Sequence, residues 1–257
     1  MRNITVSVDC GLRIIILDRP EKKNALDQEM YHDLILALKE AASDEKTFIT
    51  VITGRGDYYS SGNDITSGAD FVSGDLKERI NEACILIRNF VNAFIEFPKI
   101  LVAAVNGPAI GIGVTTLGLC DVVYASDKAT FHTPFVPLGI SAEGCSTYTF
   151  PRIMGTSKAG DLLYFNYKMT AKEAKDCGLV SEVFPDSCFA EKVFGHLKKM
   201  VTMPSKSMIF TKALVRRWDV DELRKANEAE CERLKERWGS EDFINAVVKF
   251  ISRRNKL

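Results

Sequence analysis

Residues 104–113 read Ala104-Val105-Asn106-Gly107-Pro108-Ala109-Ile110-Gly111-Ile112-Gly113. This stretch continues a β-rich run that starts at Ile100, which predicts a buried strand, and it leads into an apolar segment that predicts a helix. Glycines between the two allow a sharp turn and a close approach of the backbone to a ligand. Because the first N–H groups of a helix are unpaired and carry the positive end of its dipole, the turn suits an anion.

A second glycine turn follows another strand-like run. Residues 47–53 are rich in β-branched side chains, and the turn after them includes Ser60-Ser61-Gly62-Asn63-Asp64-Ile65. Two strands that each deliver a glycine turn predict N–H groups converging on one anion, although either turn can also be plain architecture. Neither has the Gly-x-Gly-x-x-Gly order of a dinucleotide fold or the Lys-Ser/Thr ending of a phosphate-binding loop. A nicotinamide enzyme and a nucleotidase are therefore disfavoured.

The sequence before these turns alternates strand and helix patterns. Residues 12–17 form a β-branched run, and a helix is expected from Asp27, whose carboxylate can cap the first turn. Apolar side chains recur on one face of that helix at Met30, Leu34 and Leu38. Alternating patterns of this kind predict an α/β fold around a buried sheet.

The second part of the chain is predicted to be mainly helical. After about Pro151 strand patterns nearly stop, apart from residues 180–184, and amphipathic segments follow. Thr170 to Glu173 matches a capping box, and Pro204 stands where a helix would begin.

Composition describes an ordinary globular chain. The 257 residues carry 34 basic and 34 acidic side chains, so nothing favours nucleic acid as a partner. The seven cysteines are scattered without a Cys-x-x-Cys pair, which fits a reducing compartment. No apolar run approaches the ~20 residues that a bilayer requires, so no membrane insertion is expected. The three histidines lack a second ligand at helical spacing, and no metal site is expected.

Four motifs in order resemble the crotonase, or enoyl-CoA hydratase/isomerase, superfamily. Two of them are the glycine turns described above. The others are Arg19-Pro20 with Lys23-Asn24-Ala25-Leu26, and Cys120-Asp121-Val122-Val123-Tyr124-Ala125 followed by Ala129-Thr130-Phe131. The similarity covers roughly residues 4 to 255, and four motifs in the right order are far more specific than any one of them.

The resemblance implies a crotonase (ClpP-like) spiral of ββα units with a helical C-terminal trimerisation region. Residues 1–200 would form the spiral core, and residues 201–257 would form a helical region of the same unit that assembles a homotrimer. The substrate would be an acyl-CoA thioester. Coenzyme A is then part of the substrate, and no separate cofactor is expected.

The resemblance also implies a site for the thioester carbonyl. Its oxygen would rest between the backbone amides of Asn63 and Ile112, where fixed donors can contribute ~3 to 4 kcal/mol each to stabilising an enolate. From the residues themselves, Lys22 and Lys23 can either pair with the coenzyme A phosphates at the surface or form a solvated charge run. The full set of predicted substrate-binding residues is Lys23, Asn24, Ala25, Ser60, Ser61, Gly62, Asp64, Ile65 and Gly111.

The candidate acid and base residues favour one reaction of the superfamily. In hydratases two glutamates activate a water, but the matching positions here are Thr115 and Phe135. Glu143 stands where a hydratase has glycine, and its loop resembles that of the peroxisomal-type Δ3,Δ2-enoyl-CoA isomerases, whose single catalytic glutamate occupies this position. From local sequence alone, Glu143 could instead cap the helix that follows.

The predicted reaction moves the double bond of 3-enoyl-CoA to give 2-trans-enoyl-CoA, as in the β-oxidation of unsaturated fatty acids. Glu143 would remove a proton from C2 and return one to C4. This shuttle works best if apolar walls raise the pKa of the carboxyl group toward neutrality. The candidate walls are Phe71, Phe90, Phe135 and Ile140.

Other functions stay open at the level of sequence. The rivals are a dienoyl-CoA isomerase, a weak enoyl-CoA hydratase, and a non-catalytic acyl-CoA-binding protein, against which Glu143 argues. The final residues Asn255-Lys256-Leu257 approach the Ser-Lys-Leu signal of the peroxisomal import receptor. The expected location is therefore the peroxisomal matrix, with the mitochondrion as the alternative.

Overall fold

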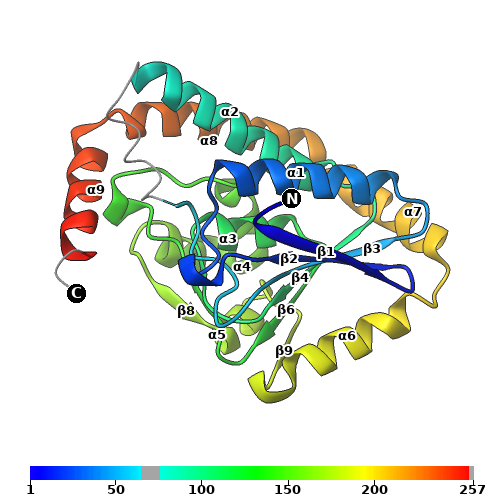
Figure 1. The fold of residues 1–257 in the computed structure, drawn as a ribbon. Coiled ribbons are helices and arrows are strands. Elements are labelled where there is room, and N and C mark those ends of the chain that lie inside the picture. Colours follow the sequence, from blue (N-terminus) through cyan, green and yellow to red (C-terminus); the bar gives the residue numbers. More distant parts are fainter. Residues whose placement is uncertain (65–75, 255–257) are drawn as a thin grey trace.

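The computed structural model describes residues 1–64 and 76–254 and contains one large sheet (Figure 1). Its strand order is β1-β2-β3-β4-β6-β9. The strands are Ile4–Asp9 (β1), Leu12–Leu17 (β2), Ile49–Gly54 (β3), Ile100–Val105 (β4), Val122–Ser126 (β6) and Glu182–Phe184 (β9). β1 runs antiparallel to β2, and every other neighbouring pair is parallel. Parallel strands place their carboxyl ends at one edge, where β3 and β4 deliver the two glycine turns.

A smaller sheet lies beside the large one. It has the order β5-β7-β8 and consists of Ala109–Ile110 (β5), Thr130–His132 (β7) and Lys168–Thr170 (β8). β5 is parallel to β7, and β7 is antiparallel to β8. β5 belongs to the second glycine turn, so this sheet fixes the position of that turn.

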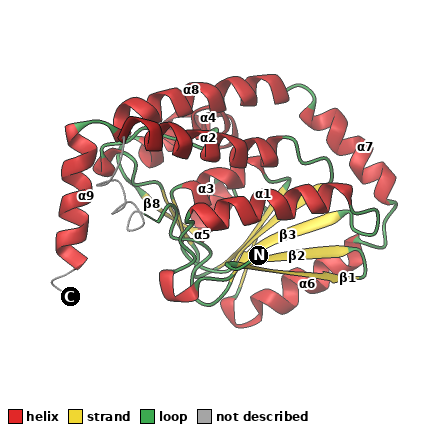
Figure 2. Cartoon of the chain, turned by 45° about the horizontal axis from the view of Figure 1, so that its top comes forward, coloured by secondary structure: helices red, strands yellow, loops and turns green. Residues whose placement is uncertain are grey.

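Helices cover both faces of the large sheet. Figures 1 and 2 show α1, α2 and α8 stacked over one face and α6 against the other. The α-helices are Gln28–Ser43 (α1), Leu76–Ile95 (α2), Ile112–Thr115 (α3), Ser146–Leu163 (α4), Ala171–Asp176 (α5), Phe189–Met200 (α6), Ser205–Arg216 (α7), Val220–Trp238 (α8) and Glu241–Arg254 (α9). Short 3-10 helices span Pro20–Lys22 (η1), Thr116–Leu119 (η3), Val136–Leu138 (η4) and Asp186–Cys188 (η5). None of the described helices is both long and apolar enough to cross a bilayer.

The apolar core forms two layers because the central strands are buried on both faces. On one face Ile15 packs in a cluster with Leu34 of α1 and Phe90 of α2. On the other face Val51 belongs to a cluster with Val193 of α6. This burial explains the continuous β-branched runs of the sequence, since both faces of a parallel sheet are covered.

The α/β class and the helical C-terminal region are confirmed, and so are several local predictions. The Asp27 side chain accepts a bond from Met30 N at 2.8 Å and starts α1, and Thr170 with Glu173 forms a capping box at the start of α5. Pro204 precedes α7. The expectation that only residues 180–184 form a strand after Pro151 is wrong, because β8 also forms there. It is three residues long, too short to leave an alternating pattern.

Candidate active site

The two glycine turns meet at one point. Gly62 has φ +81° and Gly111 has φ +55°, conformations that other residues rarely adopt. A Cβ on Gly62 would lie 2.8 Å from the carbonyl oxygen of Ile110, and a Cβ on Gly111 would lie 4.0 Å from the Cα atom of Gly62. The N–H of Ile110 donates to the Ser60 carbonyl at 2.9 Å and ties the turns together. Close contact between the two backbones therefore depends on glycine.

Each turn presents a backbone N–H group one residue after its glycine. Asn63 follows Gly62, and Ile112 follows Gly111 as the first residue of α3. Neither N–H group donates to an acceptor among the residues that the structure describes. Two adjacent unpaired donors are what an oxyanion hole requires.

The turn that carries Glu143 packs directly against this donor pair. Gly144 has φ +68°, and a Cβ there would lie 2.2 Å from Oγ1 of Thr115 and 3.2 Å from the side chain of Ile112. No side chain fits at position 144. The absence of a side chain lets the backbone after Glu143 approach α3, and so brings the glutamate beside the residue that supplies one donor.

The Glu143 carboxyl group is buried, and only one of its two oxygens has a hydrogen-bond partner among the described residues. Its residue is 1% exposed, and Oε1 accepts a bond from Nδ2 of Asn63 at 3.2 Å. Oε2 is buried without a partner among the described residues. Burial raises the pKa of Glu143 to about 8, the charge of Glu230 adds to the rise, and the bond from Asn63 opposes it. A carboxyl group of this kind can exchange a proton near neutral pH.

Asn63 has a side-chain contact that sequence reasoning missed. The Tyr31 hydroxyl donates to Oδ1 of Asn63, which leaves the Nδ2 group to donate to Glu143. Tyr31 lies on α1, 32 residues from Asn63, and Glu143 lies 80 residues beyond it. Asn63 thus has a backbone N–H group without an acceptor among the described residues, while its side chain holds the carboxyl group of Glu143.

The alternative in which Glu143 caps the next helix is wrong. Helix α4 starts at Ser146 with Cys145 as its N-cap residue, and the side chain of Cys145 makes no capping bond. The amides of Cys145 and Thr147 donate instead to the carboxylate of Glu230 on α8. The carboxyl group of Glu143 points to Asn63, so it is free of a capping role.

Most of the predicted substrate-binding residues lie where the segment 22–26 is bonded to the turn 60–64. The Ser60 hydroxyl donates to Asn24 O at 2.9 Å, and Ser61 N donates to Lys23 O at 2.9 Å. Asn24 and Ser60 are fully buried, so neither residue offers exposed surface to a ligand. Ala25 is buried beside them at 7% exposure. This bonding fixes the position of Gly62 and therefore of the first donor.

The charged residues in this region that were predicted to bind the substrate are Asp64, Lys22 and Lys23. Asp64 forms an ion pair with Arg19 at 3.2 Å, which holds the end of the turn. Lys23 lies over the ring of Tyr58 at 5.0 Å from its centroid, and Lys22 belongs to η1. Ile65 lies outside the described residues, and so do the wall candidate Phe71 and the tripeptide 255–257.

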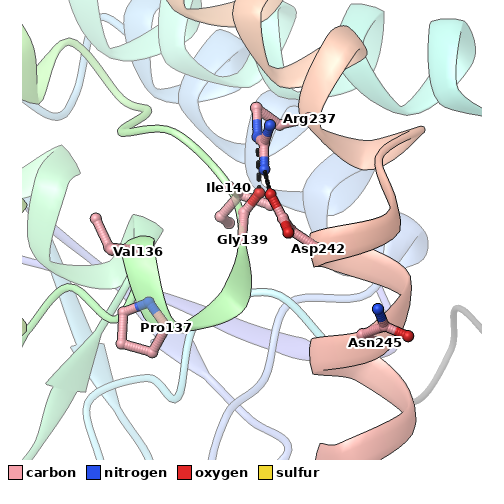
Figure 3. Close-up of a pocket in the computed structure, with 7 residues that line it drawn as sticks. All are labelled: Val136, Pro137, Gly139, Ile140, Arg237, Asp242 and Asn245. Carbon is pink, nitrogen blue, oxygen red and sulfur yellow. Dashed lines mark hydrogen bonds and ion pairs between the residues drawn. The ribbon is translucent and has the colours of Figure 1, made fainter.

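Three predicted wall residues are packed in the interior or at its edge. Phe135 and Phe90 are each 2% exposed, and the Phe90 ring meets the Tyr31 ring edge-on at 4.8 Å between centroids. Ile140 is half-buried and lines a hollow of about 410 Å³ between η4 and α9, together with Arg237 and Asp242 (Figure 3). This open hollow does not include Glu143 in its lining.

The positions that carry glutamate in hydratases hold no carboxylate here. Thr115 is fully buried and its hydroxyl bonds to Ile112 O at 3.4 Å, while Phe135 is a core residue. Within the described parts of the chain, no group of three or more His, Cys, Asp or Glu side chains could hold a metal ion. Among the described residues, the site contains the buried carboxyl group of Glu143 next to two backbone N–H groups that have no acceptor. Together they define a site that can stabilise an oxyanion while a proton moves.

Comparison with known proteins identifies the family of the chain. A model described as "Enoyl-CoA hydratase/isomerase" matches residues 8–256, and the chain belongs to that family. It is 52% identical over 256 residues to "Enoyl-CoA delta isomerase 2" of Rattus norvegicus, covering 100% of this chain and 65% of that protein. The chain thus spans somewhat less than two thirds of that relative.

Two further comparisons bear on activity and fold. The chain is 45% identical over 255 residues to "Enoyl-CoA delta isomerase 3, peroxisomal" of Mus musculus, covering 99% of this chain and 80% of that protein. A crystal structure of an enoyl-CoA hydratase/isomerase from Pseudoalteromonas atlantica T6c superposes with a TM-score of 0.88 at 30% identity, with 98% of each chain covered.

Proposed function

We propose that the chain is a Δ3,Δ2-enoyl-CoA isomerase that converts 3-enoyl-CoA to 2-trans-enoyl-CoA in the β-oxidation of unsaturated fatty acids. The observation that carries the proposal is the state of Glu143: a fully buried carboxyl group with one unpartnered oxygen among the described residues, beside the free N–H groups of Asn63 and Ile112. Similarity to relatives named enoyl-CoA delta isomerases, at 45% and 52% identity, supports it.

The proposed reaction needs one base and one anion site. The thioester carbonyl accepts bonds from the two backbone N–H groups, which makes the protons on C2 more acidic. The ionised form of Glu143 takes a proton from C2 through its unpartnered oxygen, and the electron pair moves through the conjugated system onto the carbonyl oxygen. The dienolate then takes a proton at C4 from Glu143, and its electrons return to form the double bond between C2 and C3. The proton count balances, and Glu143 ends as it began.

Hydration is disfavoured as the main activity because it needs a positioned water. Thr115 and Phe135 stand where hydratases carry their two glutamates, and neither can act as a carboxylate base. The same absence of further carboxylates at these positions weighs against a dienoyl-CoA isomerase. A non-catalytic acyl-CoA-binding role is disfavoured because the structure keeps a carboxyl group buried at a cost in stability, as its raised pKa indicates.

We further propose that the chain assembles as a homotrimer through its C-terminal helices. Helix α7 is held to the core by Arg216 and Lys212, which both pair with Asp121. Large apolar side chains on and just after α7 face away from the core and are between 60% and 73% exposed: Phe210, Leu214, Val215 and Trp218. An apolar surface of this kind is typical of a subunit interface.

A peroxisomal location is proposed on the similarity to the mouse relative whose name includes that compartment. A fluorescent fusion that carries this chain should then coincide with a peroxisomal marker. Coincidence with a mitochondrial marker would favour the alternative location instead.

The test of the proposed activity follows two reactions of the same protein. With 3-enoyl-CoA, absorbance of the conjugated thioester should grow, while water addition to 2-enoyl-CoA should be much slower. Glu143→Gln should reduce isomerisation by at least ~10²-fold, the loss typical of a missing general base, and should leave thioester binding in place. Glu228→Gln is the matched control, because it removes an exposed carboxylate of α8. Near-normal isomerisation by a folded Glu143→Gln protein would refute the proposed mechanism.

A further inference from the structure

The start of α4 is capped by a residue from a distant helix. Cys145 N donates to Glu230 Oε2 at 2.6 Å, and Thr147 donates to Glu230 Oε1 through its N–H at 3.0 Å and its hydroxyl at 2.6 Å. Glu230 lies on α8, 85 residues from Cys145, and is only 5% exposed. The cap is needed because Cys145 has φ +61° and provides no capping side chain of its own.

This cap fixes the turn that carries the proposed catalytic group. The carbonyl of Glu143 accepts a bond from the Ser146 hydroxyl at 2.8 Å, so the backbone from 143 to 146 is closed on itself. Glu230 then anchors the same turn to α8 through Cys145 and Thr147. Asn63 holds the Glu143 carboxyl group from the opposite direction. The position of Glu143 therefore depends on α8 as well as on the glycine turns.

The two buried carboxyl groups differ in the donors that they face. Glu230 accepts three bonds, which involve both of its oxygens and lie at the positive end of a helix dipole. Glu143 accepts one bond and has an oxygen without a partner in the described part of the chain. Donors stabilise the ionised form of a carboxyl group, and two like charges close together disfavour double ionisation. Glu230 is therefore the ionised member of the pair, and Glu143 holds the proton.

The other titratable groups that influence Glu143 are neutral near pH 7. Tyr31 faces it from α1, Cys84 from α2 and Cys231 from α8. Burial raises the pKa of Tyr31 well above its usual value and raises the pKa of each of these two thiols to about 12. Burial also raises the pKa of Glu230, against the three hydrogen bonds that lower it. The charge that acts on Glu143 is thus that of Glu230.

We propose that Glu230 is a positioning residue of the isomerase site: it fixes the turn that carries Glu143, and its ionised carboxylate keeps the proton of the buried pair on Glu143. This inference rests on the proposed function only in the use that catalysis makes of Glu143. The division of roles leaves Glu143 able to alternate between acid and base while Glu230 keeps its charge.

The first experiment uses the free protein and no substrate. Infrared spectroscopy at about pH 7 should show the carbonyl stretch of a protonated buried carboxylic acid, because burial keeps Glu143 protonated there. The band should disappear in Glu143→Gln, since the remaining Glu230 is ionised. Persistence of the band in Glu143→Gln would place the proton on Glu230 and overturn the proposal. This result is independent of activity, so it stands even if the assigned reaction is wrong.

The second experiment measures the pH dependence of kcat/KM with 3-enoyl-CoA. Removing the charge in Glu230→Gln should move the rising acid limb to lower pH by about one unit, the effect of losing a nearby like charge. Glu230→Asp keeps the charge and should keep the limb near its original position even if kcat falls. Glu228→Gln removes an exposed carboxylate from the same helix and should leave the profile unchanged. A folded Glu230→Gln protein whose kcat/KM profile has an unshifted acid limb would overturn the proposal. If this variant does not fold, the infrared comparison of the wild type with Glu143→Gln is the deciding test.

Discussion

Replacing Glu143 by glutamine should stabilise the folded protein at alkaline pH, although it removes the proposed base. Burial raises the pKa of this carboxyl group from 4.5 to about 8 in the folded state. Between these values the folded chain keeps a proton that the unfolded chain has released. The free energy of unfolding of the wild type should therefore fall as pH rises through this window, and the full cost should be present above pH 8.

The size of the effect follows from the difference of about 3.5 pKa units, which at about 1.4 kcal/mol per unit corresponds to an upper bound near 5 kcal/mol. Glutamine has no such titration, and its Oε1 can accept the same bond from Asn63. Its amide nitrogen would take the place of the unpartnered Oε2, and an unsatisfied buried donor costs about 1 to 3 kcal/mol. At pH 9 we expect Glu143→Gln to be more stable than the wild type by about 2 to 4 kcal/mol.

The assay is urea unfolding of both proteins at pH 5 and pH 9, followed by circular dichroism at equal protein concentration. At pH 5 the variant should unfold at an equal or lower urea concentration than the wild type, because little of the titration cost is present there and the unsatisfied amide remains. At pH 9 the order should reverse, and the variant should unfold at the higher urea concentration. Glu228→Gln should track the wild type at both pH values, because that carboxylate is exposed. If the stability of the wild type and that of Glu143→Gln depended equally on pH, the claim that folding raises the pKa of this carboxyl group would be refuted.

Three other substitutions test separate parts of the structure. Gly144→Ala should lower the free energy of unfolding by about 2 to 3 kcal/mol and remove most of the activity, because the new Cβ would lie 2.2 Å from Oγ1 of Thr115. The control Gly155→Ala, where φ is +77° but no atom lies within 4 Å of the new Cβ, should lower it by only about 1 kcal/mol. Equal losses of stability in thermal unfolding would contradict the argument. Asn63→Ala removes the bond that lowers the pKa of the Glu143 carboxyl group, so the acid limb of kcat/KM should move to higher pH, and an unmoved limb would count against this contact. Trp218→Asp places a charge on an exposed apolar surface and should shift sedimentation from trimer to monomer, whereas a wild-type protein that sediments as a monomer would remove the trimer proposal.

The fold was predictable where local chemistry determines it. β4 coincides with the run Ile100–Val105, and Asp27 caps α1 as the sequence predicts. The strand expected over residues 47–53 forms over Ile49–Gly54, a shift of the size expected for element ends. The run 180–184 shortens to Glu182–Phe184. The short strands of the smaller sheet arise from pairing with distant neighbours, and three residues are too few to show a period.

The candidate site was predictable in its backbone and less so in its side chains. The sequence alone marks Gly62 and Gly111 as turn positions, because glycine readily adopts the positive φ angles that both residues have. The contacts of Asn63 with Tyr31 and Glu143, and of Glu230 with the start of α4, join residues that lie 32 to 85 positions apart. No local pattern encodes such pairs, because each depends on how helices and turns from distant parts of the chain pack together.

The contact between Gly144 and Thr115 couples the side chains that these two positions can carry. The resemblance places a hydratase glutamate at position 115, where this chain keeps a small hydroxyl side chain against the bare backbone of Gly144. A longer side chain at 115 would have to enter the space that the Glu143 turn occupies. In this chain, glutamate at position 115 therefore requires a change in the turn that carries Glu143 as well.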